Sequence, residues 1–381
     1  MKPITTAIFF CFILFLLSST SSKTASGKNR PGNKPKIQAA ILLDVSNSMD
    51  GLIDQAKAQL WNMVSVMGKA ECNNQSPEIQ IALYEYGRPT NDARQGYVKK
   101  INDFISDLDQ LSQNLFSLKT NGGDEFCGHV IYSSLTEMDW DTASTCYKVI
   151  FIAGNEDFLQ GDIQYIKACE EAKKKGVIVN TIYCGPKMRG IQEHWNLGAE
   201  CGSGSFSNIN QYAKEMDIPT PYDTTLMSLN TKLNGTYIYY GADGMQYLAT
   251  QGFVDANNAQ LSKPAFSKRV AVKAKGYYSN KNWDVIDASK ADSSFVANVD
   301  IKTLPDSLKN KSRAELLKIV KTKSIERENI QKEITTVAAQ RDAYIVNEKT
   351  KLKTKNNEPT LETEIEKIIR EQVKQFNMMI K

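Results

Sequence analysis

The chain has 381 residues, of which 41% are hydrophobic and 24% are charged, and its formal net charge is +4. This length and composition are enough to bury a core and to build two or three domains. The charge balance is ordinary, and no basic groove with interleaved aromatic residues is apparent, so we expect no nucleic acid among the partners.

The first residues have the composition of a secretory signal peptide. Lys2 precedes an apolar run at residues 7–17 that is too short to span a bilayer, and small residues follow it. We assign residues 1–22 to the signal, with cleavage within 19–26, and keep an uncleaved anchor as the alternative. Residues 23–36 are basic and contain Gly and Pro, which predicts a flexible linker. The expected location is therefore the periplasm or the outside of the cell, with no transmembrane segment after signal removal.

Export would remove Cys11 together with the signal and place the other six cysteines in an oxidising compartment. Their even number favours disulfides, whereas two histidines and the absence of CxxC spacing argue against structural zinc. Cys184 has two credible mates, Cys201 and Cys127, and the sequence does not choose between them. Catalysis by Cys127 and His129 is disfavoured because residues two apart on a helix point in different directions. The disulfide candidates are Cys72, Cys127, Cys146, Cys169, Cys184 and Cys201.

Residues 37–215 alternate between strand-like and helix-like patterns. The strands read as almost continuous Val, Ile and Leu runs, which predicts burial on both faces and a doubly wound, mostly parallel α/β sheet. The predicted strands are 37–46, 78–87, 97–101, 146–154, 177–185 and 204–209. The predicted helices are 51–70, 103–116, 128–138, 162–176 and 188–201.

The remainder of the chain predicts helices. Residues 216–310 form a mainly helical packing region, with helices at 224–235, 244–260 and 264–277 and an irregular segment at 277–288. Residues 311–381 contain a long helix, 313–349, and an amphipathic helix, 361–377. We expect these two to fold back as a helical hairpin, with a coiled coil as the alternative and self-association through these helices as a consequence.

A cluster of oxygen-bearing side chains follows the first predicted strand. Asp44, Ser46 and Ser48 form the pattern D-x-S-x-S, and the 118–126 loop adds Thr120 and Asp124. In a parallel sheet, ligands bind where loops leave the carboxyl ends of the strands, and all these residues belong to that edge.

This combination resembles the von Willebrand factor type A (vWA) domain over roughly residues 37–210. In that family a metal-ion-dependent adhesion site (MIDAS) is built from D-x-S-x-S, a threonine on a second loop and an aspartate after the fourth strand. The segments "GGDEFCG", "FIAGNEDF", "NTIYCG" and "NWDVIDA" also resemble a bacterial group of exported proteins that join such a domain to a helical tail.

The resemblance implies a divalent cation, Mg²⁺ or otherwise Mn²⁺ or Ca²⁺, held by Asp44, Ser46, Ser48 and Thr120. An acidic side chain of a protein partner would complete the coordination shell. The sequence departs from the family at Gly154, which stands where the third-loop aspartate is expected. The substitutes to be tested are Asn155, Glu156, Asp157 and, from the other loop, Asp124.

We therefore expect an exported, non-enzymatic binding protein that uses a MIDAS-type cation to capture an acidic group. A second hypothesis is a structural scaffold with a degenerate metal site that recruits partners through its C-terminal helices. A third is a metal-assisted envelope hydrolase, which would need a positioned base near Thr120.

Overall fold

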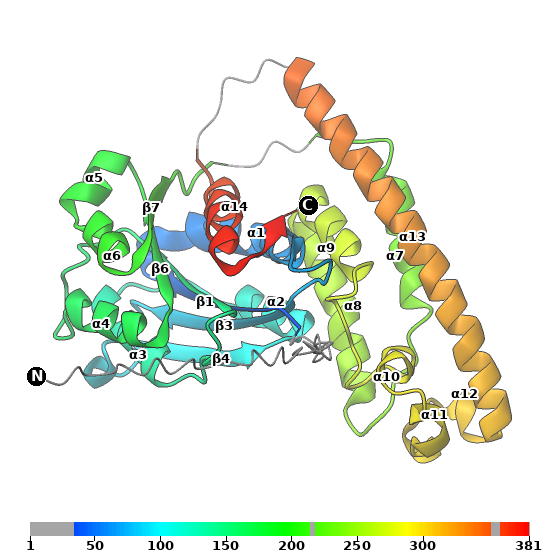
Figure 1. Cartoon of the computed structure of the whole chain (residues 1–381). Coiled ribbons are helices and arrows are strands. Elements are labelled where there is room, and N and C mark those ends of the chain that lie inside the picture. The colour runs from blue at the N-terminus through cyan, green and yellow to red at the C-terminus, as the bar shows by residue number, and fades with distance from the viewer. Residues whose placement is uncertain (1–33, 214–217, 352–358, 381) are drawn as a thin grey trace, which may run out of the picture. The chain divides into compact units, whose positions relative to one another are not determined.

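The computed structural model describes residues 34–213, 218–351 and 359–380 (Figure 1). The predicted signal peptide, 1–22, and most of the predicted linker, 23–36, lie outside the described residues. Of the linker, Lys36 already belongs to the first strand.

A six-stranded sheet forms the centre of the vWA-like part. Its strand order is β4-β3-β1-β5-β6-β7, and every neighbouring pair is parallel except the antiparallel edge pair β3 and β4. The prediction of a doubly wound, mostly parallel sheet is thereby confirmed. The strands are β1 Lys36–Asp44, β3 Glu78–Tyr86, β4 Lys99–Ile105, β5 Tyr147–Gly154, β6 Ile178–Cys184 and β7 Ser203–Ile209.

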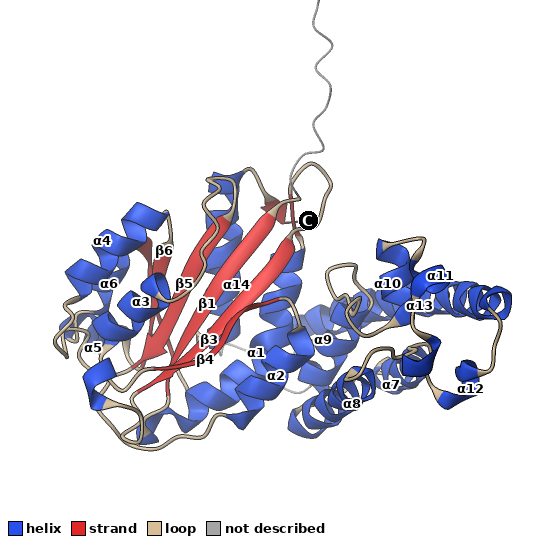
Figure 2. Cartoon of the chain, turned by 90° about the horizontal axis from the view of Figure 1, so that it is seen from below, coloured by secondary structure: helices blue, strands red, loops and turns tan. Residues whose placement is uncertain are grey.

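Helices cover both faces of this sheet (Figure 2). Successive side chains of a strand point to opposite faces, so Ile41 and Leu43 of β1 join one core while Ala40 and Leu42 join the other. The first face is covered by α1 Asp50–Gly68, α2 Leu108–Ser117 and α14 Leu361–Gln372. The second is covered by α3 Cys127–Thr136, α4 Tyr165–Lys175 and α6 Trp195–Cys201.

Two local predictions in this domain are wrong. The single helix expected at 188–201 is two helices, α5 Lys187–Gln192 and α6, because His194 adopts a left-handed backbone with φ of +63°. The helix expected from 103 begins at Leu108, because β4 runs on to Ile105 and the Asp107 carboxylate then caps the helix.

The helical region has two apolar clusters of its own. One joins α7, α9 and α13, and the other joins the segment around Ile238 with α10, α11 and the start of α13. The irregular segment expected at 277–288 ends in α10, for which Asp284 is the N-cap. The helices are α7 Asp223–Asn234, α8 Gly244–Leu261, α9 Lys263–Lys273, α10 Val285–Ala291, α11 Phe295–Asn298, α12 Asp306–Lys309 and α13 Arg313–Lys351.

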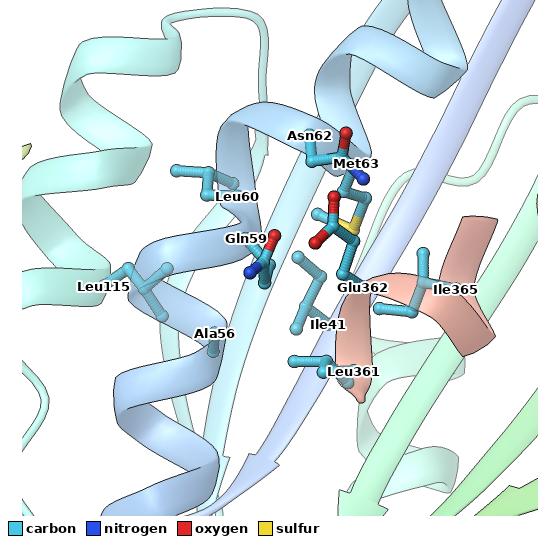
Figure 3. Close-up of a pocket in the computed structure, with 10 residues that line it drawn as sticks. All are labelled: Ile41, Ala56, Gln59, Leu60, Asn62, Met63, Leu115, Leu361, Glu362 and Ile365. Atoms are coloured by element: carbon cyan, nitrogen blue, oxygen red, sulfur yellow. The ribbon is translucent and has the colours of Figure 1, made fainter. Parts of the chain in front are cut away.

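The hairpin expected between α13 and α14 is wrong. The apolar face of α14 is buried in the sheet core against α1, whereas the apolar residues of α13 pack on α7, α9 and α10. Figure 3 shows Leu361 and Ile365 of α14 facing Ile41 and Met63, around a small pocket of about 30 Å³. Amphipathicity predicts that a helix face is buried, but it does not identify the surface that buries it.

The end of the described chain also belongs to the sheet domain. A short strand, β8 Met379–Ile380, pairs antiparallel with β2 Ala70–Glu71, which directly follows α1. Helices α7 to α13 are therefore inserted between the last strand of the sheet, β7, and the helix α14 that covers it.

One disulfide occurs in the described part of the chain, and it joins Cys169 of α4 to Cys201 of α6. Neither mate proposed for Cys184 is correct: Cys184 and Cys127 are buried free thiols, and Cys201 is already bonded. Cys72 and Cys146 are also free. The true pair lies on two helices that pack on the same sheet face, a proximity that strand and helix spacing alone does not reveal.

Candidate functional site

The site begins at the last residue of the central strand. Asp44 ends β1 between the parallel strands β3 and β5 and has no exposed surface. Its Oδ1 accepts a hydrogen bond of 2.7 Å from the backbone N–H of Ser46. Its Oδ2 is buried and accepts no hydrogen bond of normal geometry, and a weaker interaction with the backbone N–H of Asn155 lowers the pKa of the group only slightly. A buried carboxylate oxygen without a partner is costly, so Asp44 Oδ2 is a candidate ligand for a cation.

The turn after Asp44 places the two serine hydroxyls together. Ser46 Oγ and Ser48 Oγ lie 3.2 Å apart, and the Ser48 hydroxyl donates to Asn155 Oδ1 at 3.4 Å. Asn155 follows β5, so two strand ends converge here. Of the predicted site residues, the structure thus brings together Asp44, Ser46, Ser48 and Asn155.

Gly154 leaves no room for a side chain. A Cβ at this position would lie 2.5 Å from the Tyr86 hydroxyl oxygen and 3.0 Å from Asp44 Oδ2. The Tyr86 hydroxyl is fixed there because it donates to the carbonyl of Ala153 at 3.0 Å. An aspartate at this position would therefore clash with Tyr86 and Asp44 unless they moved.

Thr120 lies near the turn, but its hydrogen-bond partner, Asp50, is not among the predicted site residues. Its hydroxyl donates to the carboxylate of Asp50, the first residue of α1. The backbone N–H of Asn121 donates to the carbonyl of Val45 at 2.8 Å, which ties the loop to the end of β1. The loop therefore lies at the predicted edge, while its threonine hydroxyl is engaged by Asp50 and not by Ser46 or Ser48.

The buried carboxylate of that loop is Glu125, which is not among the predicted site residues. Glu125 is 7% exposed, whereas its neighbour Asp124 is exposed to solvent. A Cβ built on Gly87, at the end of β3, would lie 2.9 Å from Glu125 Cγ and 3.0 Å from Asp44 Oδ1. The two acidic side chains therefore flank a single point. Glu156, another predicted substitute, is exposed. The only sequence signal for Glu125 is its place two residues before the buried start of α3.

Both buried carboxyl groups resist ionisation. Burial raises the pKa of Asp44 to about 7, and hydrogen bonds from Ser46 oppose that rise. Burial also raises the pKa of Glu125 to about 8, and the neighbouring charges of Asp44 and Glu156 raise it further. Two carboxylates that share a site suppress each other's charge, and a nearby cation would reverse the effect.

These donors fit a hard divalent cation. Carboxylate, hydroxyl and amide oxygens are the ligands that Mg²⁺ and Ca²⁺ prefer. Within the described residues, no group of three or more His, Cys, Asp or Glu side chains could hold a metal ion. A cation at this edge would consequently depend on Ser46 and Ser48 in addition to the carboxylates.

A pocket of about 520 Å³, lined by both polar and apolar residues, adjoins this edge at Asp50. It lies between the first turns of α1, the segment after β7 and the junction of α8 and α9. Asp54 and the exposed Tyr212 line it, together with Gln211, whose buried side-chain oxygen has no hydrogen-bond partner.

Sheet order, the antiparallel edge strand and the position of D-x-S-x-S after β1 define the class of this protein: the chain contains a domain with the von Willebrand factor type A fold. No family model matches the sequence, and no curated protein matches it either.

Several solved structures are similar to it. Proximal thread matrix protein 1 from the mussel byssus, in a structure with a zinc-occupied MIDAS motif, is 13% identical with a TM-score of 0.34 and 46% of this chain covered. The chain covers only 42% of that protein's own length. The SpRpn10 VWA domain is 14% identical with a TM-score of 0.34. The alignment covers 46% of this chain and 88% of that domain. An aerotolerance-related membrane protein from Bacteroides fragilis is 14% identical with a TM-score of 0.32. The alignment covers 46% of this chain and 92% of that structure. Similarity at this level concerns the fold alone.

Among the helices of the described residues, none is long and apolar enough to cross a membrane.

Proposed function

We propose that this protein is an exported, non-enzymatic binding protein that captures an acidic group of a protein partner through a divalent cation. Asp44, Ser46, Ser48 and Asn155 would hold the ion, with Mg²⁺ as the first choice and Mn²⁺ or Ca²⁺ as alternatives. The observation that carries the proposal is the buried, unpartnered Oδ2 of Asp44, one turn away from two adjacent serine hydroxyls.

Thr120 has a conditional part in this proposal. Its hydroxyl is bonded to Asp50, and it would have to leave that carboxylate in order to reach the ion. The exposed Ser48 lies on the outer side of the turn, where a partner could approach. A small site with few carboxylates leaves the ion electrophilic enough to attract an outside acid.

The proposal contains no catalytic step. A hydrolase would need a base beside the ion, and the histidine nearest in sequence, His129, packs its ring against Gly96. The scaffold hypothesis is weakened in one respect, because the apolar face of α14 is already buried in the sheet domain. Recruitment or self-association would have to use α13, which exposes Leu317, Ile325 and Val346.

Titration calorimetry of the folded mature protein with Mg²⁺ and Mn²⁺ tests the proposal. We expect heat of binding in the wild type, none in Asp44→Asn, and unchanged binding in Asp243→Asn, a control at the start of α8. Capture of envelope proteins should then require Mg²⁺ and disappear with chelator. Absence of heat in the wild type, or capture that persists in chelator and in Asp44→Asn, would overturn the proposal.

A further inference from the structure

The loop after β5 does not supply a buried carboxylate to the site. Gly154 has no space for one, and the side chain of Asn155 is an amide that accepts from Ser48. Glu156 is exposed, and Asp157 accepts from the backbone of Leu159 and contacts His194. With ligands from Asp44 and the loop after β5 alone, a cation at this edge would therefore have a single buried carboxylate, that of Asp44.

Glu125 occupies the opposite side of Asp44. Its Cγ and Oε1 lie 2.9 Å and 3.7 Å from the point where Gly87 would carry a Cβ, and Asp44 Oδ1 lies 3.0 Å from the same point. Gly87 has a φ of +82°, a left-handed backbone that other residues rarely adopt. The turn after β3 thus keeps this position free of a side chain. The space is filled by Asp44, which comes from β1, and by Glu125, which comes from the 118–126 loop.

Among the residues that the structure describes, no positive side chain forms an ion pair with Asp44 or Glu125. Arg88 follows Gly87 directly, but its guanidinium pairs with Glu85 at 2.9 Å and also donates to the carbonyl of Lys119. Ionising two buried carboxyl groups side by side is unfavourable unless a cation joins them. Asp44 Oδ1, which accepts from Ser46, lies on the Glu125 side, whereas the unpartnered Oδ2 lies on the Gly154 side, so the Asp44 carboxylate keeps one oxygen available to a cation.

We propose that Glu125 is the second carboxylate of the cation site and substitutes for the third-loop aspartate whose place is taken by Gly154. This inference rests on the proposed cation-binding function and adds a ligand to it. The site would then draw its charge from the first and second loops, with Asn155 as the neutral contribution of the third.

Three variants of the full mature chain test this assignment. Glu125→Gln keeps the shape of the side chain and removes its charge, Asp124→Asn removes the adjacent exposed charge as a matched control, and Asp44→Asn disables the site. Mn²⁺ is the probe, measured by titration calorimetry. We expect at least tenfold weaker binding in Glu125→Gln, less than twofold change in Asp124→Asn, and no binding in Asp44→Asn.

A thermal melt in chelator separates a ligand from a merely structural residue. If Glu125 is a ligand, Glu125→Gln should melt at the same or a higher temperature than the wild type without metal, because Gln keeps the shape of the side chain and cannot ionise beside Asp44. It should also gain less from added Mn²⁺. A lower melting temperature in chelator would instead show a structural residue and contradict the assignment.

The two proposals fail in different ways. Wild-type affinity in Glu125→Gln, combined with lost binding in Asp44→Asn, would overturn the role of Glu125 and leave the cation site standing. No binding by the wild type would overturn the proposed function itself, and with it the role of Glu125.

Discussion

The hydroxyl of Tyr147 on β5 donates a hydrogen bond of 2.7 Å to the side-chain oxygen of Gln372 on α14. These residues are 225 positions apart, and both are buried. The Gln372 amide nitrogen donates in turn to Asn180 of β6 at 2.7 Å. The last long helix is thus fixed to the middle of the sheet, and the helices inserted before it are held between two parts of one domain.

This arrangement predicts that α14 stabilises the vWA-like domain. Ile369 is fully buried in the sheet core, and truncation of a buried Ile to Ala typically costs about 2–5 kcal/mol. We expect Ile369→Ala to lower the free energy of unfolding by that amount in urea denaturation. The control is Ile325→Ala on α13, which is 52% exposed and should change stability by less than about 0.5 kcal/mol. Equal effects of the two variants would contradict the packing of α14.

The close packing around Gly154 predicts that restoring the family's aspartate is harmful. In Gly154→Asp, the new Cβ would meet the Tyr86 hydroxyl and Asp44 Oδ2, so we expect a lower melting temperature and no gain in cation affinity. Gly252→Asp is the control, because a Cβ at Gly252 meets no atom within 4 Å. Adding Tyr86→Phe to Gly154→Asp should recover part of the stability. Tighter Mg²⁺ binding by Gly154→Asp would show that the clash is relieved by movement of the loop.

The two buried acids predict a pH dependence of stability. In the unfolded chain both carboxyls titrate at their ordinary pKa of about 4, whereas in the folded protein the pKa of Asp44 is about 7 and that of Glu125 about 8. Between these values the folded protein holds more protons than the unfolded chain, so the free energy of unfolding falls as pH rises from about 4 to about 8.

Melting temperatures in chelator between pH 5 and pH 8.5 measure this effect. The decline should be smaller in the double variant Asp44→Asn, Glu125→Gln, and saturating Mg²⁺ should oppose it because the ion favours the ionised carboxylates. Cation affinity should rise over the same range. A decline of equal size in wild type and double variant would assign it to other groups.

The disulfide predicts a stability change that is separate from cation binding. Cys169 and Cys201 close a loop with a sequence separation of 32, and such a crosslink typically contributes about 2–4 kcal/mol. We expect Cys169→Ser with Cys201→Ser to reduce the free energy of unfolding by that amount and to leave Mn²⁺ affinity unchanged. Cys72→Ser, at a free and partly exposed cysteine, should have little effect on either.

A buried cluster of charged side chains around Arg269 is predicted to stabilise the contact of the inserted helices α8 and α9 with α2. The guanidinium of Arg269 on α9 is fully buried and pairs with Asp109 of α2 at 2.6 Å and Asp255 of α8 at 2.5 Å. Removing one partner of such a pair typically costs about 3–5 kcal/mol, so Arg269→Ala should be strongly destabilising in urea. Arg94→Ala, in the exposed pair with Asp92, should leave stability unchanged. A small effect of Arg269→Ala would mean that the interface relaxes around the loss.

Part of the site could be predicted because it is local. Asp44, Ser46 and Ser48 occupy one turn after a buried strand, so their convergence follows from sequence spacing. Glu125 could not be distinguished from Asp124 in this way, since both are acidic and adjacent. Glu125 is buried beside Gly87, which follows the distant strand β3, whereas Asp124 is exposed. The engagement of Thr120 by Asp50 depends in the same way on how a loop docks onto α1.

By itself, the sequence determined the alternation of strands and helices, the burial of both sheet faces, and the D-x-S-x-S turn at the carboxyl end of β1. These features follow from hydrophobic periodicity and from contacts between residues close together in the chain. Only the tertiary structure decided that α14 covers the sheet, that Cys169 pairs with Cys201, and that Glu125 faces Asp44. Each of these contacts joins segments far apart in sequence, and an apolar face or a reactive side chain does not encode which distant surface will meet it.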